Sequence, residues 1–347
     1  MISSNKNRHL IIGGYDVSRY MLSSNIPYGT YRKPEWGDLP VDSQLDVSCI
    51  NTAGIFSSLS AIGMLRGIDY KSAPIEIRTI EGGIKYIEWS GIIDQITEDH
   101  KSQTVSIKGT SKLSQTLNSP ALLSFNAADP VTLSRNIFEQ FGIAVDDGAY
   151  NSAINQLGGL VTVKISPNFL ESQLTLMEMQ KLLSIAASGR IYTTNNGMAM
   201  QVFSAATPTI TTSIFDRDIM EHPIITSMDD SVSPYSVAWQ GGEAKSVDYI
   251  TGGQSQSLDF GPNSPVKILD NGSAIFVADQ WESISKRKIR QVSLAIKNSI
   301  GRSLNLNSWI KMTWKKGGFD AIPLEIIGID YTDPRYTKLD GRYSFGK

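Results

Sequence analysis

Apolar and polar residues alternate along much of the first 110 residues, which is the pattern of strands with one buried face. Gly82-Gly83 separates two of these runs and predicts a hairpin turn. Many short strands in succession are typical of a sandwich or barrel. The strands predicted in this part lie at residues 10–12, 45–50, 75–80, 84–89, 91–94 and 105–109.

The pattern changes to a helical one near residue 126. Asp129-Pro130 predicts a helix start, since aspartate is a good N-cap and proline suits the first helical position. Gly142 is a natural end of that helix. A second helix is predicted to begin at Thr175, which forms a capping box with Glu178.

The remaining chain returns to strands. Asn195-Asn196-Gly197 lies between two apolar runs, at 191–193 and 198–203, and predicts a hairpin. Residues 226–265 are rich in Gly, Ser, Asp and Gln, and are predicted to be long loops around a strand at 235–239. The last strands are predicted at 292–296, 309–314 and 324–330. The fold class is therefore a β-rich α+β protein, with β-barrel or sandwich domains at 1–125 and 216–347 and a small α+β domain at 126–215.

Two stretches near the ends of the chain echo each other. The run from Leu45 through Asn51 to Gly54 resembles the run from Val292 through Asn298 to Gly301. Gly91-Ile92-Ile93-Asp94 likewise resembles Gly328-Ile329-Asp330, and the order is the same in both halves. These echoes indicate two copies of one β domain. Two unrelated β domains with common turn chemistry are the alternative.

Composition limits the classes of function. Charged residues make up 19% of the 347 residues and the net charge is -2, so no basic excess points to nucleic acid or to a membrane surface. The single cysteine, Cys49, cannot form an internal disulfide, which fits folding in a reducing cytosol. Met1–Arg8 lacks the apolar core of a signal peptide, and no apolar run reaches the length of a membrane span.

Residues with catalytic or metal-binding chemistry are scattered. His9, His100 and His222 do not have the spacing of a zinc site, and Cys49 is interpreted as a packing residue on a strand. No nucleophile elbow or phosphate-binding loop occurs. The glycine doublets are interpreted as turns; they lie at 13–14, 82–83, 158–159, 241–242, 252–253 and 317–318.

Charged and aromatic clusters are interpreted as structural. Asp94 with Glu98 and Asp99 has the residue types of a carboxylate pair or a calcium site, but a solvated strand end is favoured. Asp146-Asp147 and Asp229-Asp230 lack the spacing of a calcium-binding loop. The basic run Lys286-Arg287-Lys288 with Arg290 is interpreted as a solvated or subunit-facing strand rather than a phosphate contact. Tryptophans 281, 309 and 314 are assigned to the core or an interface. The prediction is that the chain has no catalytic, cofactor-binding or metal-binding residues.

The order of these elements resembles the tail-hub family of tailed bacteriophages and related contractile injection machines. The segments that carry the resemblance lie between residues 16 and 203. They are Asp16-Val17-Ser18, LDVSCINTAGIF at 45–56, EIRTIEGGIKYIEWSGIIDQITED at 76–99, ADPVTLSRNIFEQFGI at 128–143 and TLMEMQKLLSIAASGRIYTTNNGMAMQVF at 175–203. Residues 216–290 depart from the family pattern, which leaves the start of the second barrel open.

The resemblance implies two tail-tube-like barrels per chain, and a homotrimer that forms a pseudo-hexameric ring in the baseplate or tail tip. Such a virion protein is a structural hub, not an enzyme, and is assembled in the host cytoplasm without membrane insertion. Its implied partners are the tail tube or distal tail protein above, a spike, fibre or tip protein below, and DNA that passes without specific binding. Alternatives are a hexameric distal tail ring protein, a carbohydrate- or receptor-binding β protein, and a cell-wall glycosidase or peptidase.

Overall fold

The computed structural model divides into two compact units, which are described separately. The first comprises residues 1–30, 42–117 and 330–334, and the second comprises 31–41, 118–329 and 335–347. The residues that the structure describes are 8–25, 31–32, 36–39, 44–57, 73–81, 84–111, 116–120, 123, 126–158, 163, 165–168, 174–194, 197–204, 210–227, 234–247, 249, 255–286, 288–301, 303–304, 306, 308–330 and 335–345.

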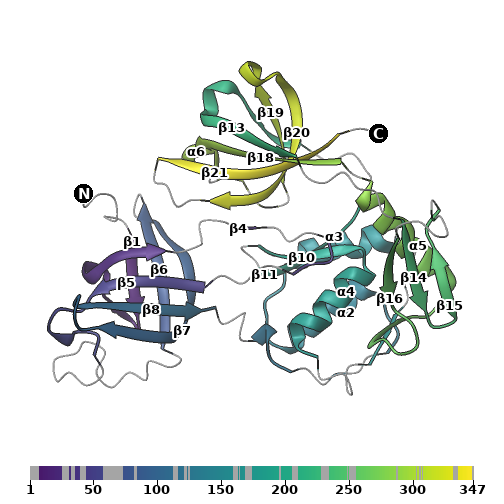
Figure 1. The fold of residues 1–347 in the computed structure, drawn as a ribbon, viewed down its shortest axis with the longest axis horizontal. Helices are drawn as coiled ribbons and strands as arrows, with labels where there is room; N and C mark the ends of the chain where they lie inside the picture. Colours follow the sequence, from purple (N-terminus) through teal and green to yellow (C-terminus); the bar gives the residue numbers. More distant parts are fainter. Residues whose placement is uncertain are drawn as a thin grey trace. The chain divides into compact units, whose positions relative to one another are not determined.

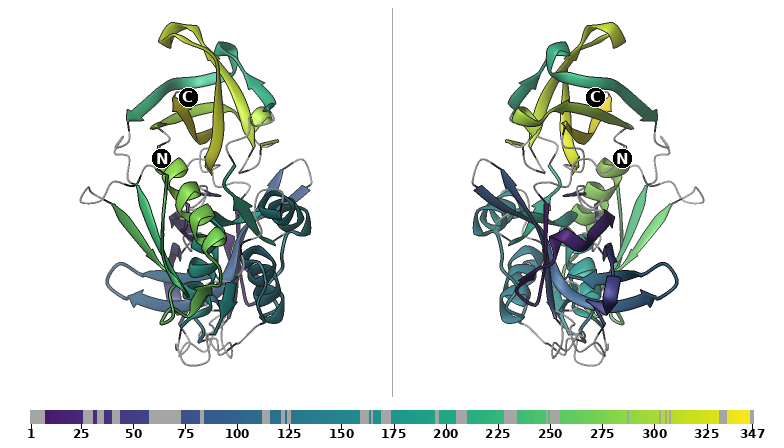
Figure 2. Two further views of the ribbon diagram at one scale, coloured as in Figure 1. Left: turned by 90° about the vertical axis from the view of Figure 1, so that its right-hand side faces the viewer. Right: turned by 90° about the vertical axis from the view of Figure 1, so that its left-hand side faces the viewer.

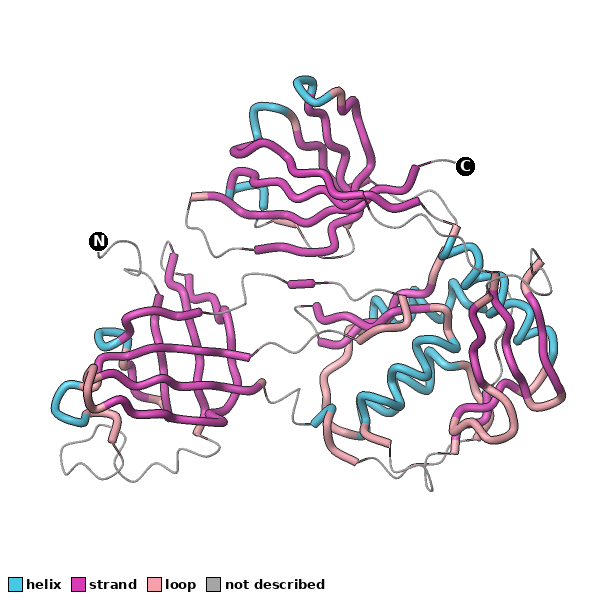
Figure 3. The backbone as a smooth tube through the Cα atoms, in the orientation of Figure 1, coloured by secondary structure: helices cyan, strands magenta, loops and turns pink. Residues whose placement is uncertain are grey.

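The first unit is one curled antiparallel sheet with the strand order β2-β1-β6-β7-β8-β5-β3 (Figure 3). Its two edge strands, β2 and β3, are consecutive in the chain and are joined by the short helix η1. The elements are β1 (Arg8–Ile12), β2 (Tyr15–Asp16), η1 (Ser18–Tyr20), β3 (Met21–Asn25), β5 (Gln44–Ile50), η2 (Thr52–Gly54), β6 (Pro74–Glu81), β7 (Ile84–Asp99) and β8 (Thr104–Thr110).

Alternation along these strands places one set of side chains in a common core. In β8, for example, Val105 and Ile107 are fully buried, while Ser106 between them is partly exposed. Leu45, Val47 and Cys49 of β5 pack into the same core cluster. The six strands predicted in this part of the chain are present, and those predicted at 84–89 and 91–94 form the single strand β7.

The second unit contains an α+β part in which helices lie against a hairpin (Figure 1). Both predicted helix starts are found: Asp129 accepts hydrogen bonds from the backbone N–H groups of Val131 and Thr132, and Thr175 with Glu178 forms the capping box. The elements are α2 (Pro130–Gln140), α3 (Asp147–Gly158), β9 (Ile165–Pro167), α4 (Leu176–Ala186), β10 (Gly189–Thr194) and β11 (Gly197–Val202).

Within residues 226–265, which the sequence predicted to be long loops around one strand at 235–239, the described residues contain three complete strands. Three strands pair in the order β15-β14-β16, and a helix, α5, lies along them (Figure 2). β17 pairs with β9, so this segment belongs with the α+β part rather than with the strands that follow it. The elements are β14 (Tyr235–Trp239), β15 (Gly242–Lys245), β16 (Gln256–Asp259), β17 (Val266–Ile268) and α5 (Asn271–Ser285).

The second unit also contains a second curled sheet, with the strand order β12-β19-β20-β21-β18-β13. A short strand from the beginning of the chain, β4 (Tyr31–Arg32), pairs with the end of β20. The other elements are β12 (Ile210–Ile214), η3 (Asp216–Asp218), β13 (Ile219–Ser227), β18 (Lys288–Lys297), α6 (Asn298–Gly301), β19 (Trp309–Trp314), η4 (Lys315–Gly317), β20 (Phe319–Asp330) and β21 (Tyr336–Phe345).

The predicted fold class is confirmed: the protein is a β-rich α+β protein with two curled sheets and an α+β part between them in the sequence. The two domain boundaries predicted from the sequence, at residues 125 and 215, stay a prediction. Among the described residues, no helix is long and apolar enough to cross a membrane.

Candidate assembly surface

Cys49 is a core residue of the first sheet. Its side chain is fully buried in β5, and burial raises the pKa of the thiol to about 12. A thiol held in this neutral form is a poor nucleophile. The structure therefore places Cys49 where the packing interpretation expected it.

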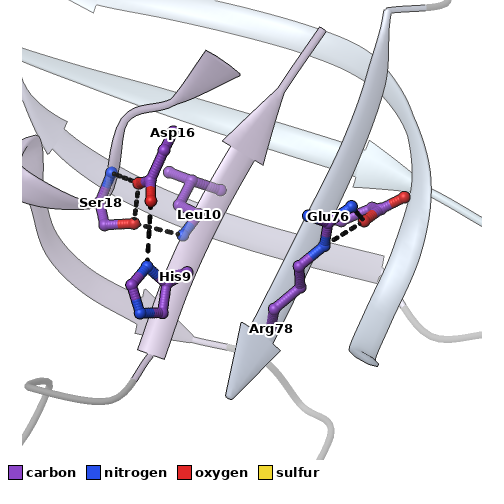
Figure 4. Close-up of polar contacts among 6 residues, drawn as sticks. All are labelled: His9, Leu10, Asp16, Ser18, Glu76 and Arg78. Carbon is purple, nitrogen blue, oxygen red and sulfur yellow. Dashed lines mark hydrogen bonds and ion pairs between the residues drawn. The ribbon is translucent and has the colours of Figure 1, made fainter. Parts of the chain in front are cut away.

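His9, Asp16 and Ser18 form a polar network at the edge of the first sheet (Figure 4). The Asp16 carboxylate accepts a hydrogen bond from the Ser18 backbone N–H at 3.0 Å and lies 3.0 Å from Nδ1 of His9. Ser18 Oγ donates to Asp16 and accepts from the backbone N–H of Leu10, so the hydroxyl has no contact with the imidazole in this network. Burial acts to raise the pKa of Asp16, but the hydrogen bonds from Ser18 and His9 outweigh it and lower the pKa. The network joins the β1–β2 turn to η1 and lacks the serine–histidine contact of a nucleophile pair.

The acidic residues at the end of β7 either accept hydrogen bonds from neighbouring residues of the same chain or are exposed. Asp99 accepts hydrogen bonds from the Lys101 backbone N–H and the Ser102 hydroxyl, which lower its pKa. Glu98 accepts a hydrogen bond from Asn51 at 3.2 Å, and Asp94 is exposed on the strand. His100 lines a shallow polar hollow beside Asp99. The described residues contain no cluster of three or more histidines, cysteines and acids that could hold a metal ion.

Other candidates also have structural contacts. Asp146 accepts a hydrogen bond from the backbone N–H of Ala149 at the start of α3, and Asp147 lies 2.6 Å from Arg135. Trp281 donates its indole N–H to the Ile185 carbonyl. Lys286 pairs with the buried Glu282, whereas Arg287 and Asp229-Asp230 lie outside the described residues. The glycine doublets at 13–14, 241–242 and 317–318 form turns, and the others are not fully described.

The two curled sheets have the same strand order. β3-β5-β8-β7-β6 in the first sheet corresponds to β13-β18-β21-β20-β19 in the second. The two sequence similarities predicted between the halves of the chain lie on corresponding elements. β5 and η2 correspond to β18 and α6, and β7 corresponds to β20. This agreement supports a true internal repeat over the alternative of two unrelated β domains.

The first sheet contains one additional strand. β12 is parallel to β19 in the second sheet, whereas β1 is antiparallel to β6 at the matching place in the first. Because β2 runs antiparallel to β1, β2 has the direction of β12. β2 is therefore the counterpart of β12 and β6 the counterpart of β19, and β1 is an additional strand between them. The order of the other strands is the same in both sheets.

Each sheet also has the same corner where its two edge strands meet. η1 carries Ser18-Arg19-Tyr20 before β3, and η3 carries Asp216-Arg217-Asp218 before β13. The arginines match in position; each is exposed, and each lies over an aromatic ring, at 4.6 Å from the Tyr20 centroid and 5.6 Å from the Phe215 centroid. This third echo was missed from the sequence, although the spacing of an arginine three residues before Leu22 and Met220 is a signal for it.

Exposed apolar side chains lie at these edges. Leu22 and Met220, each the second residue of its edge strand, are 49% and 51% exposed. Tyr15 on β2 and Phe215 beside η3 are also exposed, and Ile224 on β13 reaches 68%. Edge strands present unpaired backbone groups on one side, which makes them the natural place for another strand to bind. The edges of the two sheets form the candidate assembly surface.

A buried ionic cluster holds the second sheet against the α+β part of the same unit. Arg190 on β10 is fully buried and donates to Glu325 on β20, which also accepts from Nε of Arg342 on β21 at 2.8 Å. The guanidinium of Arg190 lies 4.1 Å from the ring of Trp36, which packs on Phe203. This cluster fixes the orientation of the second sheet within the unit, because buried charges require their partners in defined positions.

Sequence comparisons alone do not classify the chain. No protein-family model matches it, and no curated protein matches it.

Three crystal structures of tail proteins, two of them from prophages, have a similar fold. A 43 kDa tail protein of prophage MuSo2 from Shewanella oneidensis is 13% identical, with a TM-score of 0.55 and 96% of each chain covered. A tail protein from Neisseria meningitidis is 10% identical, with a TM-score of 0.56 over 97% of this chain and 96% of that one. The prophage tail protein gp18 from Listeria monocytogenes is 8% identical, with a TM-score of 0.50 over 99% of this chain and 95% of that one. The resemblance to phage tail proteins that the sequence predicted is confirmed at the level of the fold.

Proposed function

We propose that the protein is a structural component of a phage tail tip, a hub that assembles as a homotrimeric ring. The observation that carries this proposal is the pair of curled sheets with one strand order in one chain. Three such chains supply six similar sheets, so a ring with three-fold symmetry presents six similar positions to its neighbours. Such a ring joins parts of different symmetry.

The fold shared with three tail proteins, two of them from prophages, supports the location in the virion tail. In this role the ring seats on the tail tube or distal tail protein, holds a spike, fibre or tip protein, and surrounds the path of the DNA. A net charge of -2 is suited to a channel that DNA crosses without binding, because a basic lining would retain phosphate.

The mass of the purified assembly tests this proposal. Native mass spectrometry is expected to give a species of three times the 38.0 kDa chain, because edge pairing closes the ring at three copies. The matched comparison is the same sample in a low concentration of urea, in which the monomer appears. A six-chain species would favour a distal tail ring protein instead, and a monomer at all concentrations would remove the proposal.

A further inference from the structure

The second sheet extends beyond the first at one end. Asn25, the last described residue of β3, pairs with Asp46 of β5. The counterpart of Asp46 is Ser293, and Ser293 pairs with Ile224 of β13. β13 continues to pair with β18 for three residues, Ile225–Ser227, past Ile224, the residue that matches Asn25.

The two neighbouring strands continue by the same amount. Gln44 pairs with Thr110 at the end of the first sheet, and the matching pair in the second sheet is Gln291 with Arg342. β18 begins at Lys288, three residues before Gln291, and β21 ends at Phe345, three residues after Arg342. Ser111 is described and lies outside β8, so the matching strand stops at Thr110. We call the three-stranded extension, residues 225–227, 288–290 and 343–345, the arm.

Aromatic packing supports the base of the arm. Tyr343 is buried and meets Phe319 edge-on at 6.2 Å, and Phe319 stacks on Trp314 at 5.9 Å. His222 of β13 lies 5.8 Å from the ring of Trp314. Edge-on and stacked rings at these distances are stabilising, so aromatic packing holds the base of the arm in the sheet.

The outer edge of the arm lacks the features that protect edge strands. Ile224 and Ile225 are consecutive, so their side chains lie on opposite faces, yet they are 68% and 40% exposed. Pro223 lies in the same strand, and the segment that follows it, Ile224–Ser227, contains no charge and no further proline, the residues that commonly block edge-to-edge pairing. A partner that covers both faces of one edge strand is itself a strand, because a neighbouring strand places side chains on both faces of the sheet.

We infer that the edge formed by Ile224 and the adjoining arm residues 225–227 of β13 pairs with a sheet edge of a second copy of this chain. This rests on the proposed ring and names the strand that joins its subunits. Because β8 stops at Thr110, the described part of the first sheet has no such three-stranded arm. One arm provides one contact per subunit, which is the number that a closed head-to-tail ring requires. The β-branched side chains of Ile224, Ile225 and Thr226 favour the pairing of this strand with another strand.

Charge placed on the arm tests the inference. Ile224→Lys and Ile225→Lys are expected to weaken self-association by about tenfold or more, because a lysine in a strand interface must be desolvated. Val247→Lys and Ile275→Lys are the matched controls, since both side chains are exposed, at 83% and 38%, and lie away from the curled sheet. Sedimentation velocity over a concentration series measures the association, and circular dichroism checks that each variant folds.

Hydrogen exchange on the unaltered protein gives a second reading. The amides of residues 225–227 are expected to exchange at least about tenfold more slowly in the assembly than in the diluted monomer. Arm variants that assemble like the controls, or equal exchange in the two states, would overturn the inference while leaving the ring itself intact. A protein that never assembles would instead refute the proposed function, so the two failures are distinguishable.

Discussion

Replacing Glu325 with glutamine is expected to lower the free energy of unfolding of the second unit by about 3–5 kcal/mol. Glu325 is 5% exposed and accepts hydrogen bonds from Arg190 and Arg342, which are themselves 0% and 5% exposed. Glutamine keeps the shape but removes the negative charge between two buried guanidiniums. Urea unfolding followed by tryptophan fluorescence measures the loss, because every tryptophan except Trp89 belongs to this unit.

An exposed ion pair of the same unit provides the control. Asp38 lies 3.3 Å from Lys181, and both side chains are more than half exposed. Asp38→Asn is therefore expected to cost less than about 1 kcal/mol. If the two substitutions had equal effects, the buried cluster would not orient the second sheet.

Gly197→Ala is expected to destabilise the second unit by about 3 kcal/mol or more. Gly197 begins β11 with φ of 133°, a conformation that side chains rarely adopt. An added Cβ would also overlap the carbonyl of Ala144, whose oxygen accepts the Met198 N–H at 2.8 Å. Backbone strain and steric overlap therefore act together where the start of β11 contacts the residues just before α3. Urea unfolding measures the sum of the two costs.

Gly318→Ala separates the two causes. Gly318 has φ of 77°, but an added Cβ would have no atom within 4 Å. The expected cost is about 1 kcal/mol, from backbone strain alone. A Gly197 variant no less stable than the Gly318 variant would show that the overlap with Ala144 is relieved by a small shift of the backbone.

Local signals explain which elements the sequence predicted well. Asp129-Pro130 and the pair Thr175 and Glu178 determine helix starts through bonds within four residues, so the chemistry is visible in the sequence. The helix α5 has a similar signal that was missed: Asp270 accepts from the Ser273 N–H, and its buried residues Ala274, Val277, Ala278 and Trp281 follow helical spacing. The glycine and serine content of the preceding segment concealed it.

Long-range partners could not be read from the sequence. Glu325 alternates with apolar residues in β20, which predicts a solvent-facing position, and only the fold brings Arg190 to it over 135 positions. The arm is likewise visible only when the registers of the two sheets are compared, because each strand by itself has an ordinary length.

The central claim is that sheet edges join three chains around an opening. Cryo-electron microscopy of the purified assembly tests it most directly, since views along the ring axis resolve the number and arrangement of curled sheets. We expect three-fold symmetry, six similar β densities around a central hole, and an arm at each of three subunit junctions. A closed particle without an opening, or subunits that meet through their helices, would contradict it.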